Sequence, residues 1–448
     1  MLKRTLSLVL AALFIAAALA GCNKPSSNDP NSTPGGTDAT PPDPGKQSIV
    51  IGGVRSQSGP LAIFDQTAFG PLYRMWADEV NADGGIYVEE YGKKLPVELK
   101  IYDDKSDVQT MTQLYEQLCL EEQVDILLPP VSTAALFAAA PIAQKYGYLL
   151  LSAEGGATSL KEQIEVCPNF FSVLSFSDTQ VPDLVTLCEE QGITSAYIVY
   201  IEDLHGTEYF TATENAFAAA GIEIKAGKPI PLDTTTTDFN AIINDARASG
   251  AQLFATYVYP DQAIPLAATA IALEYNPDIY LMGSGGSFDF IKGALAGGSG
   301  VSPDDMVEGM MAWGAWNGRS APEAQAFLDK FDAYFGPDGQ NILNNPDAGD
   351  KEVYHDWWGH ICYQTVFEII QEAIEKTGTL DNQKLVDYIA NNHFQTSLGD
   401  TWFENNMLAA ECYYGSVGQW QNGEFEVVDV GSRRTADPIV PKPAWAKP

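Results

Sequence analysis

Short apolar strands alternate with helical patterns along the chain, and this alternation limits the possible folds more than any other feature. The first run starts with an expected strand at Ser48–Val54 and ends with one at Tyr148–Leu151. Between them, apolar residues at helical spacing predict helices near Phe69–Val80, Met111–Leu118 and Ala134–Tyr146. Strands that alternate with helices are typical of βαβ units, which build a parallel sheet.

The same pattern restarts in the middle of the chain. A strand is expected at Ala196–Ile201, followed by a helix near Tyr209–Ala220 and a strand at Leu253–Tyr257. A further helix at Gln262–Leu273 leads to a strand at Ile279–Met282. Because roughly 400 residues exceed the size at which one core stops growing, we expect an α/β fold of two doubly wound parallel-sheet lobes.

The N-terminal segment has the features of a secretion signal. Two basic residues lead into the apolar run Leu6–Ala20, which is shorter than the roughly 20 residues that a membrane-spanning helix needs. Residues 1–21 are therefore expected to be removed. The ending Leu19-Ala20-Gly21-Cys22 resembles a bacterial lipobox, which implies lipidation at Cys22, although Ala18-Leu19-Ala20 would also suit an ordinary signal peptidase.

Residues 22–47 form the next segment and are rich in Pro, Ser, Gly, Thr, Asn and Asp. Such a composition cannot bury enough apolar surface to offset the entropy of ordering, so it predicts a disordered tether. The whole chain has 25 basic and 59 acidic side chains and a net charge of −34. A surface this negative repels phosphate groups, which argues against nucleic-acid partners and leaves the lipid as the expected membrane contact.

The familiar sequence patterns of enzymes and metal sites are absent. G-x-S-x-G, H-E-x-x-H, the Walker loop and G-x-G-x-x-G do not occur. His355 and His360 are five residues apart and would diverge on a helix. Five cysteines follow Cys22 without C-x-x-C spacing, so at most two disulfides could form and no zinc site is expected. The Gly336–Asp350 loop lacks the ligand spacing of a calcium site and is expected to be a surface insertion. We expect no enzyme, cofactor or metal.

Several segments resemble a known family. Ser58-Gly59-Pro60-Leu61-Ala62, Glu79–Ile86, Tyr102-Asp103-Asp104 and Pro130-Val131-Ser132-Thr133 are similar to motifs of the solute-binding proteins of branched-chain amino acid type ABC importers. In the second half, Thr236–Phe239 and Gly250–Leu253 are similar to that family's motifs as well. The resemblance extends from about residue 48 to about 430. It implies the type I periplasmic-binding-protein fold, with two lobes joined by a hinge of three crossovers.

The resemblance also implies where the lobes begin and end, and which partners the protein has. Residues 48–166 with 311–408 are expected in one lobe, and 167–310 with 409–448 in the other. The protein is expected to act as a monomer that delivers a small-molecule solute to an ABC importer permease. It would be held by its lipid at the cell membrane, facing the periplasm or the cell exterior.

Candidate ligand-binding residues follow from the resemblance, because ligands of open α/β sheets bind beyond the carboxyl ends of strands. In the first lobe, Ser132 and Thr133 begin a helix whose free N–H groups suit an anion, although such residues often only cap helices. Glu154, Gly155 and Gly156 follow the next strand. The remaining candidates are an aromatic wall residue and five second-lobe residues: Phe64, Tyr200, Asp203, Tyr257, Tyr259 and Ser284.

The charge partners of the solute stay open at this stage. Amino-acid binders of this family often place an acid where this chain has Gly283–Gly286. Asp203, Asp261 or Glu154 could replace it, or the solute could lack an amine, since relatives carry amides, urea and aromatic acids. Arg55 could pair with a solute carboxylate, or it could be a solvent-facing loop charge.

The sequence therefore predicts an extracytoplasmic, lipid-anchored receptor. It would close on a small polar solute, such as an amino acid or a related amide or carboxylate, and pass it to the permease. Two alternatives remain at this stage. One is a ligand-sensing receptor of the same fold that does not transport, and the other is an extracellular hydrolase that uses paired carboxylates.

Overall fold

The computed structural model describes residues 45–336, 353–413, 415–429 and 433–448. The predicted signal sequence, Cys22, most of the predicted tether and nearly all of the predicted loop at 336–350 lie outside these residues. Pro44–Pro448 form one compact unit, and all that follows concerns the described part of that unit.

Two sheets and the helices around them form the part of the unit that we call lobe 1. In the first sheet β1 lies between β4 and β5 and pairs with both in parallel. A second sheet has the order β15-β16-β7-β6, in which β6 and β7 are parallel. The strands are β1 (Ile49–Arg55), β4 (Val97–Asp103), β5 (Ile126–Leu127), β6 (Leu150–Ser152), β7 (Phe170–Ser172), β15 (Phe403–Glu404) and β16 (Met407–Leu408).

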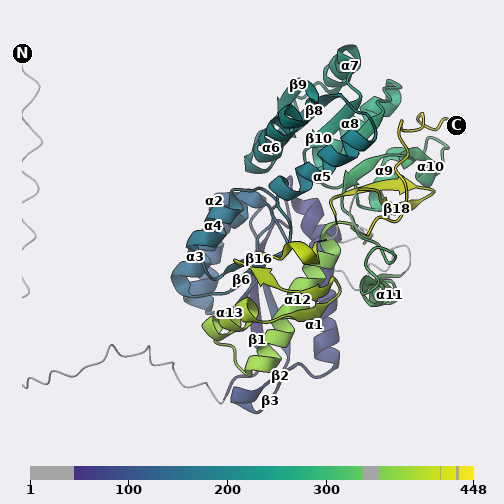
Figure 1. Ribbon diagram of the computed structural model, residues 1–448. Coiled ribbons are helices and arrows are strands. Elements are labelled where there is room, and N and C mark those ends of the chain that lie inside the picture. The colour runs from purple at the N-terminus through teal and green to yellow at the C-terminus, as the bar shows by residue number, and fades with distance from the viewer. Residues whose placement is uncertain (1–44, 337–352, 414, 430–432) are drawn as a thin grey trace, which may run out of the picture. The chain divides into compact units, whose positions relative to one another are not determined.

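Helices cover the two sides of these sheets. In Figure 1, α2, α3 and α4 lie together on one side, and α1 and α12 on the other. β1 has the near-continuous apolar sequence of a strand buried on both faces, and Ile49, Ile51 and Val54 are fully buried. The helices are α1 (Gly70–Ala82), α2 (Val108–Gln117), α3 (Thr133–Tyr146), α4 (Leu160–Val166), α12 (Gly359–Thr377) and α13 (Asn382–Asn391), with the short π-helix η1 (Phe64–Phe69) before α1.

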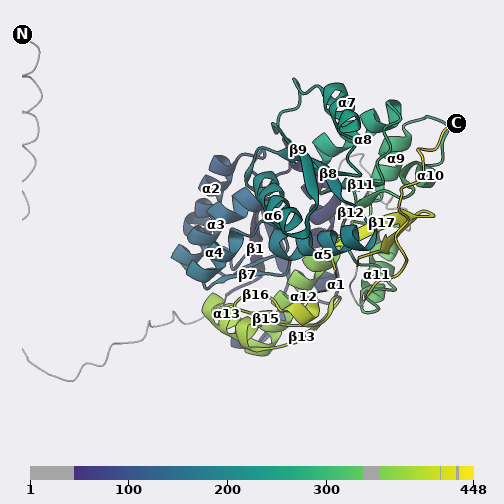
Figure 2. The same cartoon turned by 45° about the horizontal axis from the view of Figure 1, so that its top comes forward.

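A larger sheet organises the part that we call lobe 2. Among the described residues it has the strand order β18-β17-β12-β11-β10-β8-β9, parallel from β12 to β9 and antiparallel at β17 and β18. Helices α5 and α6 cover one face, and α7 and α8 the other (Figure 2). The strands are β8 (Ser195–Ile201), β9 (Glu223–Ile230), β10 (Leu253–Tyr257), β11 (Ile279–Met282), β12 (Met311–Trp313), β17 (Val417–Gln421) and β18 (Glu424–Val427). The helices are α5 (Ser177–Glu190), α6 (Leu204–Ala220), α7 (Phe239–Ser249), α8 (Pro260–Ala272), α9 (Phe290–Ala296) and α10 (Pro303–Val307). Helix α11 (Ala324–Phe335) follows β12 and lies near α12 of lobe 1.

The predicted α/β class is confirmed, and two strands refine the division into lobes. β7 pairs with β6 of lobe 1, and β12 pairs with β11 of lobe 2. We therefore propose that the first two crossovers lie one strand later than the sequence suggested, after Ser172 and after Trp313. The third crossover is the segment between β16 and β17.

Three further features concern the described residues. The cysteines after Cys22 are all buried free thiols, so no disulfide forms among them. At the end of β4, Asp104 is buried and Asp103 accepts hydrogen bonds from the Gln57 and Ser58 amides. Within the described residues, no helix is long and apolar enough to cross a membrane.

Candidate functional site

A cavity lies between the two lobes, beyond the carboxyl ends of their strands. It has about 60 Å³ of space open to the centre of a water molecule, room for roughly four waters. Its lining is mostly apolar. Residues from both lobes contribute, and eight of the predicted ligand-binding residues are among them: Phe64, Ser132, Thr133, Glu154, Gly155, Gly156, Tyr259 and Ser284.

Three predicted residues do not line this cavity. Tyr200 stacks on Phe210 with ring centroids 4.4 Å apart. Tyr257 is buried within lobe 2, where its hydroxyl accepts a hydrogen bond from Thr213. The carboxylate of Asp203 caps α6 and accepts a 2.7 Å hydrogen bond from the hydroxyl of Tyr259. Asp203 therefore does not line the cavity itself but holds the side chain of Tyr259, which does. Tyr200 and Tyr257 pack inside lobe 2.

The start of α3 forms one end of the cavity. Ser132 caps this helix through a 3.3 Å hydrogen bond from the Ala135 amide, and its backbone is held at φ 89° and ψ 156°. Glycine alone adopts that region readily, and such strain gathers at functional sites. Among the described residues, the amides of Thr133 and Ala134 have no acceptor, and the buried hydroxyl of Thr133 has no partner. These free donors and the positive helix end make a site for an anion.

A buried ion-pair network lies beneath the same wall. Arg55 ends β1, Asp65 lies in η1, and Glu154 follows β6. The guanidinium of Arg55 donates to Asp65 Oδ1 at 2.7 Å, to Glu154 Oε1 and to the carbonyl of Pro129. Arg55 is fully buried. The solvent-facing interpretation of Arg55 was therefore wrong, because its charge is paired inside the protein. Its buried Nη2 has no hydrogen-bond partner among the described residues, and pairing with a solute carboxylate stays a prediction.

Burial controls the protonation of this network. Desolvation outweighs the attraction of Arg55 and raises the pKa of Glu154 to about 8. Its second oxygen, Oε2, is buried and accepts no hydrogen bond from any described residue. Glu154 thus lines the cavity with one oxygen engaged and the other unused.

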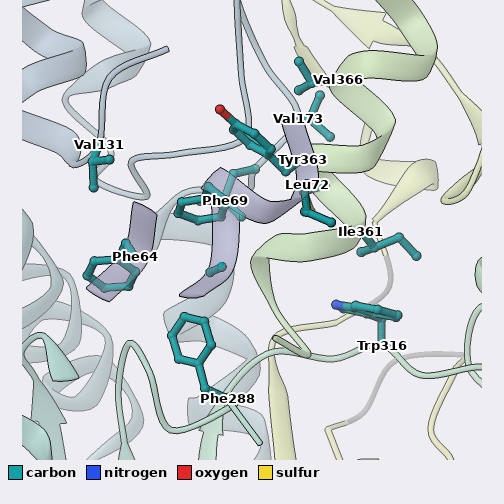
Figure 3. Packing of buried hydrophobic residues seen from close by; sticks show 14 of the residues in the cluster. Phe64, Phe69, Leu72, Val131, Val173, Phe288, Trp316, Ile361, Tyr363 and Val366 are labelled. Atoms are coloured by element: carbon teal, nitrogen blue, oxygen red, sulfur yellow. The ribbon is translucent and has the colours of Figure 1, made fainter. Parts of the chain in front are cut away.

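An aromatic wall joins the lobes. The ring of Phe64 lies 5.8 Å from that of Tyr259 and 6.0 Å from that of Phe288, both in lobe 2. Figure 3 shows Phe64 and Phe288 pointing toward one another from different elements. Both Phe64 and Phe69 come from η1, so this π-helix supplies aromatic wall as well as Asp65. π-Helices of this kind are frequent at functional sites.

Sequence reasoning missed several cavity residues. His205 lines the cavity from the start of α6, with Nε2 3.4 Å from Ser284 Oγ, and burial lowers the pKa of its ring. It lies two residues beyond Asp203, so the rule that ligands bind at strand ends could have found it. Trp358 and Gly359 begin α12, and in the described residues 353–357 no strand leads into this helix. That rule could not have found them.

Contacts between the lobes close the cavity. The Ser177 amide donates to the Gly156 carbonyl at 2.7 Å, and the Ser159 amide donates to Glu208 at 2.8 Å. A Cβ at Gly156 would lie 2.3 Å from the hydroxyl of Tyr209 in lobe 2. These contacts hold the two lobes together beside the cavity.

The periplasmic binding protein family model matches residues 48–424 of the chain. The chain belongs to the periplasmic binding protein family. Members of this family bind solutes and do not convert them, in agreement with the predicted absence of catalysis. Among the described residues of this periplasmic binding protein, no cluster of His, Cys, Asp and Glu could hold a metal ion.

Solved structures share the fold of this periplasmic binding protein. The branched-chain amino acid binding protein LivJ of Streptococcus pneumoniae, solved with isoleucine, is 17% identical, with a TM-score of 0.67 over 89% of this chain and 100% of that one. The leucine-binding protein LivK of Thermotoga maritima is 16% identical, with a TM-score of 0.66 over 86% and 99%. A solute-binding protein from R. palustris, solved with 4-hydroxybenzoate, is 18% identical, with a TM-score of 0.62 over 89% and 96%.

Proposed function

We propose that this periplasmic binding protein is the lipid-anchored receptor of an ABC importer, and that it closes on a small solute whose carboxylate binds at the start of α3. The observation that carries the proposal is the unpartnered hydroxyl of Thr133, buried at a helix N-terminus within an enclosed cavity between two lobes.

The charge distribution supports a carboxylate at this end. A buried hydroxyl without a partner costs about 1 to 3 kcal/mol, and a ligand acceptor would remove that cost. Thr133 O–H and the amides of Thr133 and Ala134 can all donate to the same anion. The isoleucine, benzoate and 4-hydroxybenzoate bound to structural relatives each carry one carboxylate.

The rest of the cavity suits an apolar body. Leu61, Phe64, Leu174, Tyr259 and Trp358 form its walls, and they come from both lobes. A solute held at α3 would therefore place its apolar part between the lobes and stabilise the closed form. Differential affinity of this kind is what converts binding into a signal for a permease.

Anchoring and delivery complete the proposal. The Leu19-Ala20-Gly21-Cys22 ending and the polar segment after it support a lipid at Cys22 and a tether long enough to let the receptor reach a permease. The protein acts as a monomer in this account. A receptor that only senses its solute would bind and close in the same way, but it would not support uptake by a permease and ATPase in vesicles.

A thermal-shift screen tests the proposed solute class. The chain from Cys22 onward is stripped of bound solute by unfolding and refolding, and it is then screened against amino acids, aromatic acids, amides and polyamines. A true solute stabilises by about 2.7 kcal/mol at a hundredfold excess over its dissociation constant. We expect stabilisation only by compounds with a carboxylate. Stabilisation by amides or polyamines alone would contradict the proposal.

A further inference from the structure

Lobe 2 contributes no acid to the lining of the cavity. Gly283–Gly286 contain no acid, and neither Asp203 nor Asp261 lines the cavity. The carboxylate of Asp203 is also occupied, by Tyr259 and by the Gly206 amide. Among the residues that line the cavity, the one acid is Glu154 in lobe 1.

Glu154 is held so that one oxygen is fixed and the other is unused. Arg55 donates to Oε1, and the buried Oε2 has no hydrogen-bond partner among the described residues. Arg55 itself is fixed by Asp65, by the Pro129 carbonyl and by the faces of Phe69 and Tyr363, 5.7 and 5.5 Å from its carbon Cζ. This is the arrangement of a positioned acceptor.

The buried charges leave Glu154 without compensation. Asp65 already balances Arg55, so ionised Glu154 gives the network a net charge of −1. The other groups that interact with Glu154 cannot supply a positive charge: Asp104 is a further acid, and the buried phenols of Tyr115 and Tyr363 have pKa values raised by desolvation. A cation must come from the cavity, or Glu154 must keep a proton.

The same wall also holds the proposed carboxylate site. A Cβ built at Gly155 would lie 3.3 Å from the Cα of Thr133, so the loop that carries Glu154 packs directly on the start of α3. The anion site at the start of α3 and the carboxylate of Glu154 are therefore neighbours on one wall. This arrangement matches a solute that carries a carboxylate and an amine on the same carbon atom.

We propose that Glu154 is the specificity-determining residue of this cavity: its Oε2 receives the ammonium group of the solute, and Glu154 releases its proton to solvent as the pair forms. The inference rests on the proposed function and names the solute as an amino acid held by lobe 1 alone at both charged groups. Arg55 is a positioning residue for this acid.

Proton release follows from the raised pKa of about 8 for Glu154. Below that pH the solute-free protein carries a neutral Glu154, and an ammonium partner lowers its pKa, so binding releases up to one proton per solute. Affinity for an amine-bearing solute then falls about tenfold for each pH unit from 8 to 6. An acid that lacks the amine leaves Glu154 protonated and shows no such fall.

Calorimetric titration with matched probes tests the inference. The common L-amino acids are compared with their amine-free analogues, such as L-leucine with 4-methylpentanoate and L-phenylalanine with 3-phenylpropanoate, in phosphate and in Tris at pH 7. We expect at least one amino acid to bind at least tenfold tighter than its analogue and to release a proton. Glu154→Gln should lose about 30-fold in affinity for that amino acid, show no proton release and bind the analogue unchanged.

The possible outcomes distinguish the role of Glu154 from the proposed function. Equal or tighter binding of the amine-free acid, or binding of the amino acid without proton release, overturns the role of Glu154 and leaves the proposed function standing. Binding of neither kind of acid overturns both. Glu165→Gln, on the exposed face of α4, is the matched control. If Glu154→Gln does not fold, the comparison of the two buffers with the unaltered protein still shows whether binding of the amino acid releases a proton.

Discussion

Gly156 of lobe 1 packs so closely on Tyr209 of lobe 2 that a Cβ at Gly156 would lie 2.3 Å from the tyrosine hydroxyl. That hydroxyl is fully buried and donates a 2.8 Å hydrogen bond to Gln180, so it cannot move away cheaply. The contact joins the two lobes, and we expect it to be lost when they separate. Gly156 is therefore a place where closure can be blocked without altering either lobe.

Gly156→Ala should weaken solute binding at least about tenfold, because overpacking of 1 to 3 kcal/mol falls on the closed form alone. The thermal stability of the solute-free protein should hardly change. Gly293→Ala is the control, since a Cβ at Gly293 in α9 meets no atom within 4 Å. Titration and thermal melts of both variants check this; a destabilised solute-free Gly156→Ala protein with unchanged affinity would refute it.

Thr133→Val should lower affinity about tenfold and leave stability unchanged or slightly higher. The buried hydroxyl of Thr133 has no partner among the described residues, so its removal costs the fold nothing, but it removes a donor to the solute. Thr213→Val is the opposite case. Its hydroxyl is bonded to the carbonyl of Tyr209 and to the hydroxyl of Tyr257, away from the cavity.

Thr213→Val should therefore lose about 1 to 3 kcal/mol of unfolding free energy with unchanged affinity. Urea unfolding and calorimetric titration of the two variants give the comparison. If Thr133→Val retained full affinity, the carboxylate would not bind at α3.

Arg55→Met should cost about 3 kcal/mol of unfolding free energy, because it leaves the buried carboxylate of Asp65 without its cation. Arg55→Met combined with Glu154→Gln should cost no more than Arg55→Met alone, because Glu154, with its pKa raised to about 8, already carries little charge at pH 7. Lys145→Met is the surface control, where an exposed ion pair contributes less than about 1 kcal/mol. Urea midpoints measure all three; a double variant less stable than Arg55→Met would contradict the network.

The C-terminal segment gives a pH-dependent prediction. Lys442 is buried, with Nζ over the ring of Trp445 at 3.5 Å, and desolvation lowers its pKa from 10.5 to about 7. A lysine whose folded pKa is lowered binds fewer protons in the folded than in the unfolded state between those two values. Burial of Lys442 therefore lowers the unfolding free energy most below pH 7, and this destabilisation fades as the pH rises toward 10.5.

Lys442→Met should consequently raise the unfolding free energy at pH 6 by about 1 kcal/mol. Above pH 7 the unfolding free energy of the variant should increase less steeply with pH than that of the unaltered protein. The gain is kept small by the lost 2.7 Å hydrogen bond from Nζ to the Pro443 carbonyl. Thermal melts from pH 6 to 9 check the slope. An unchanged slope would show that Lys442 is charged or exposed in the folded state.

Much of the fold could be predicted because its strands are continuous apolar runs. The limits of β10 and β11 agree with the sequence pattern, since both are fully buried apolar runs. β9 was missed because most of its residues are exposed or half-buried and carry three charges. The antiparallel pair β17 and β18 joins the sheet from about 100 residues beyond β12, and no local pattern encodes that pairing.

The sequence could predict the site residues that follow the ends of strands. It could not predict those whose place depends on a partner far away in the sequence. Ser132, Glu154 and Ser284 follow strands, and all three line the cavity. Arg55 was misread because its carboxylate partners lie 10 and 99 residues away, a relation that only folding reveals. Tyr257 was misplaced because the side chains of a strand alternate between faces, and this one points into lobe 2.

A crystal structure of the chain with the solute that stabilises it most tests the central claim most directly. We predict closed lobes with the solute between Phe64 and Tyr259 and its carboxylate within about 3.2 Å of the hydroxyl of Thr133 and the first amides of α3. A solute bound outside this cavity, or bound within it with its carboxylate away from α3, would contradict the account.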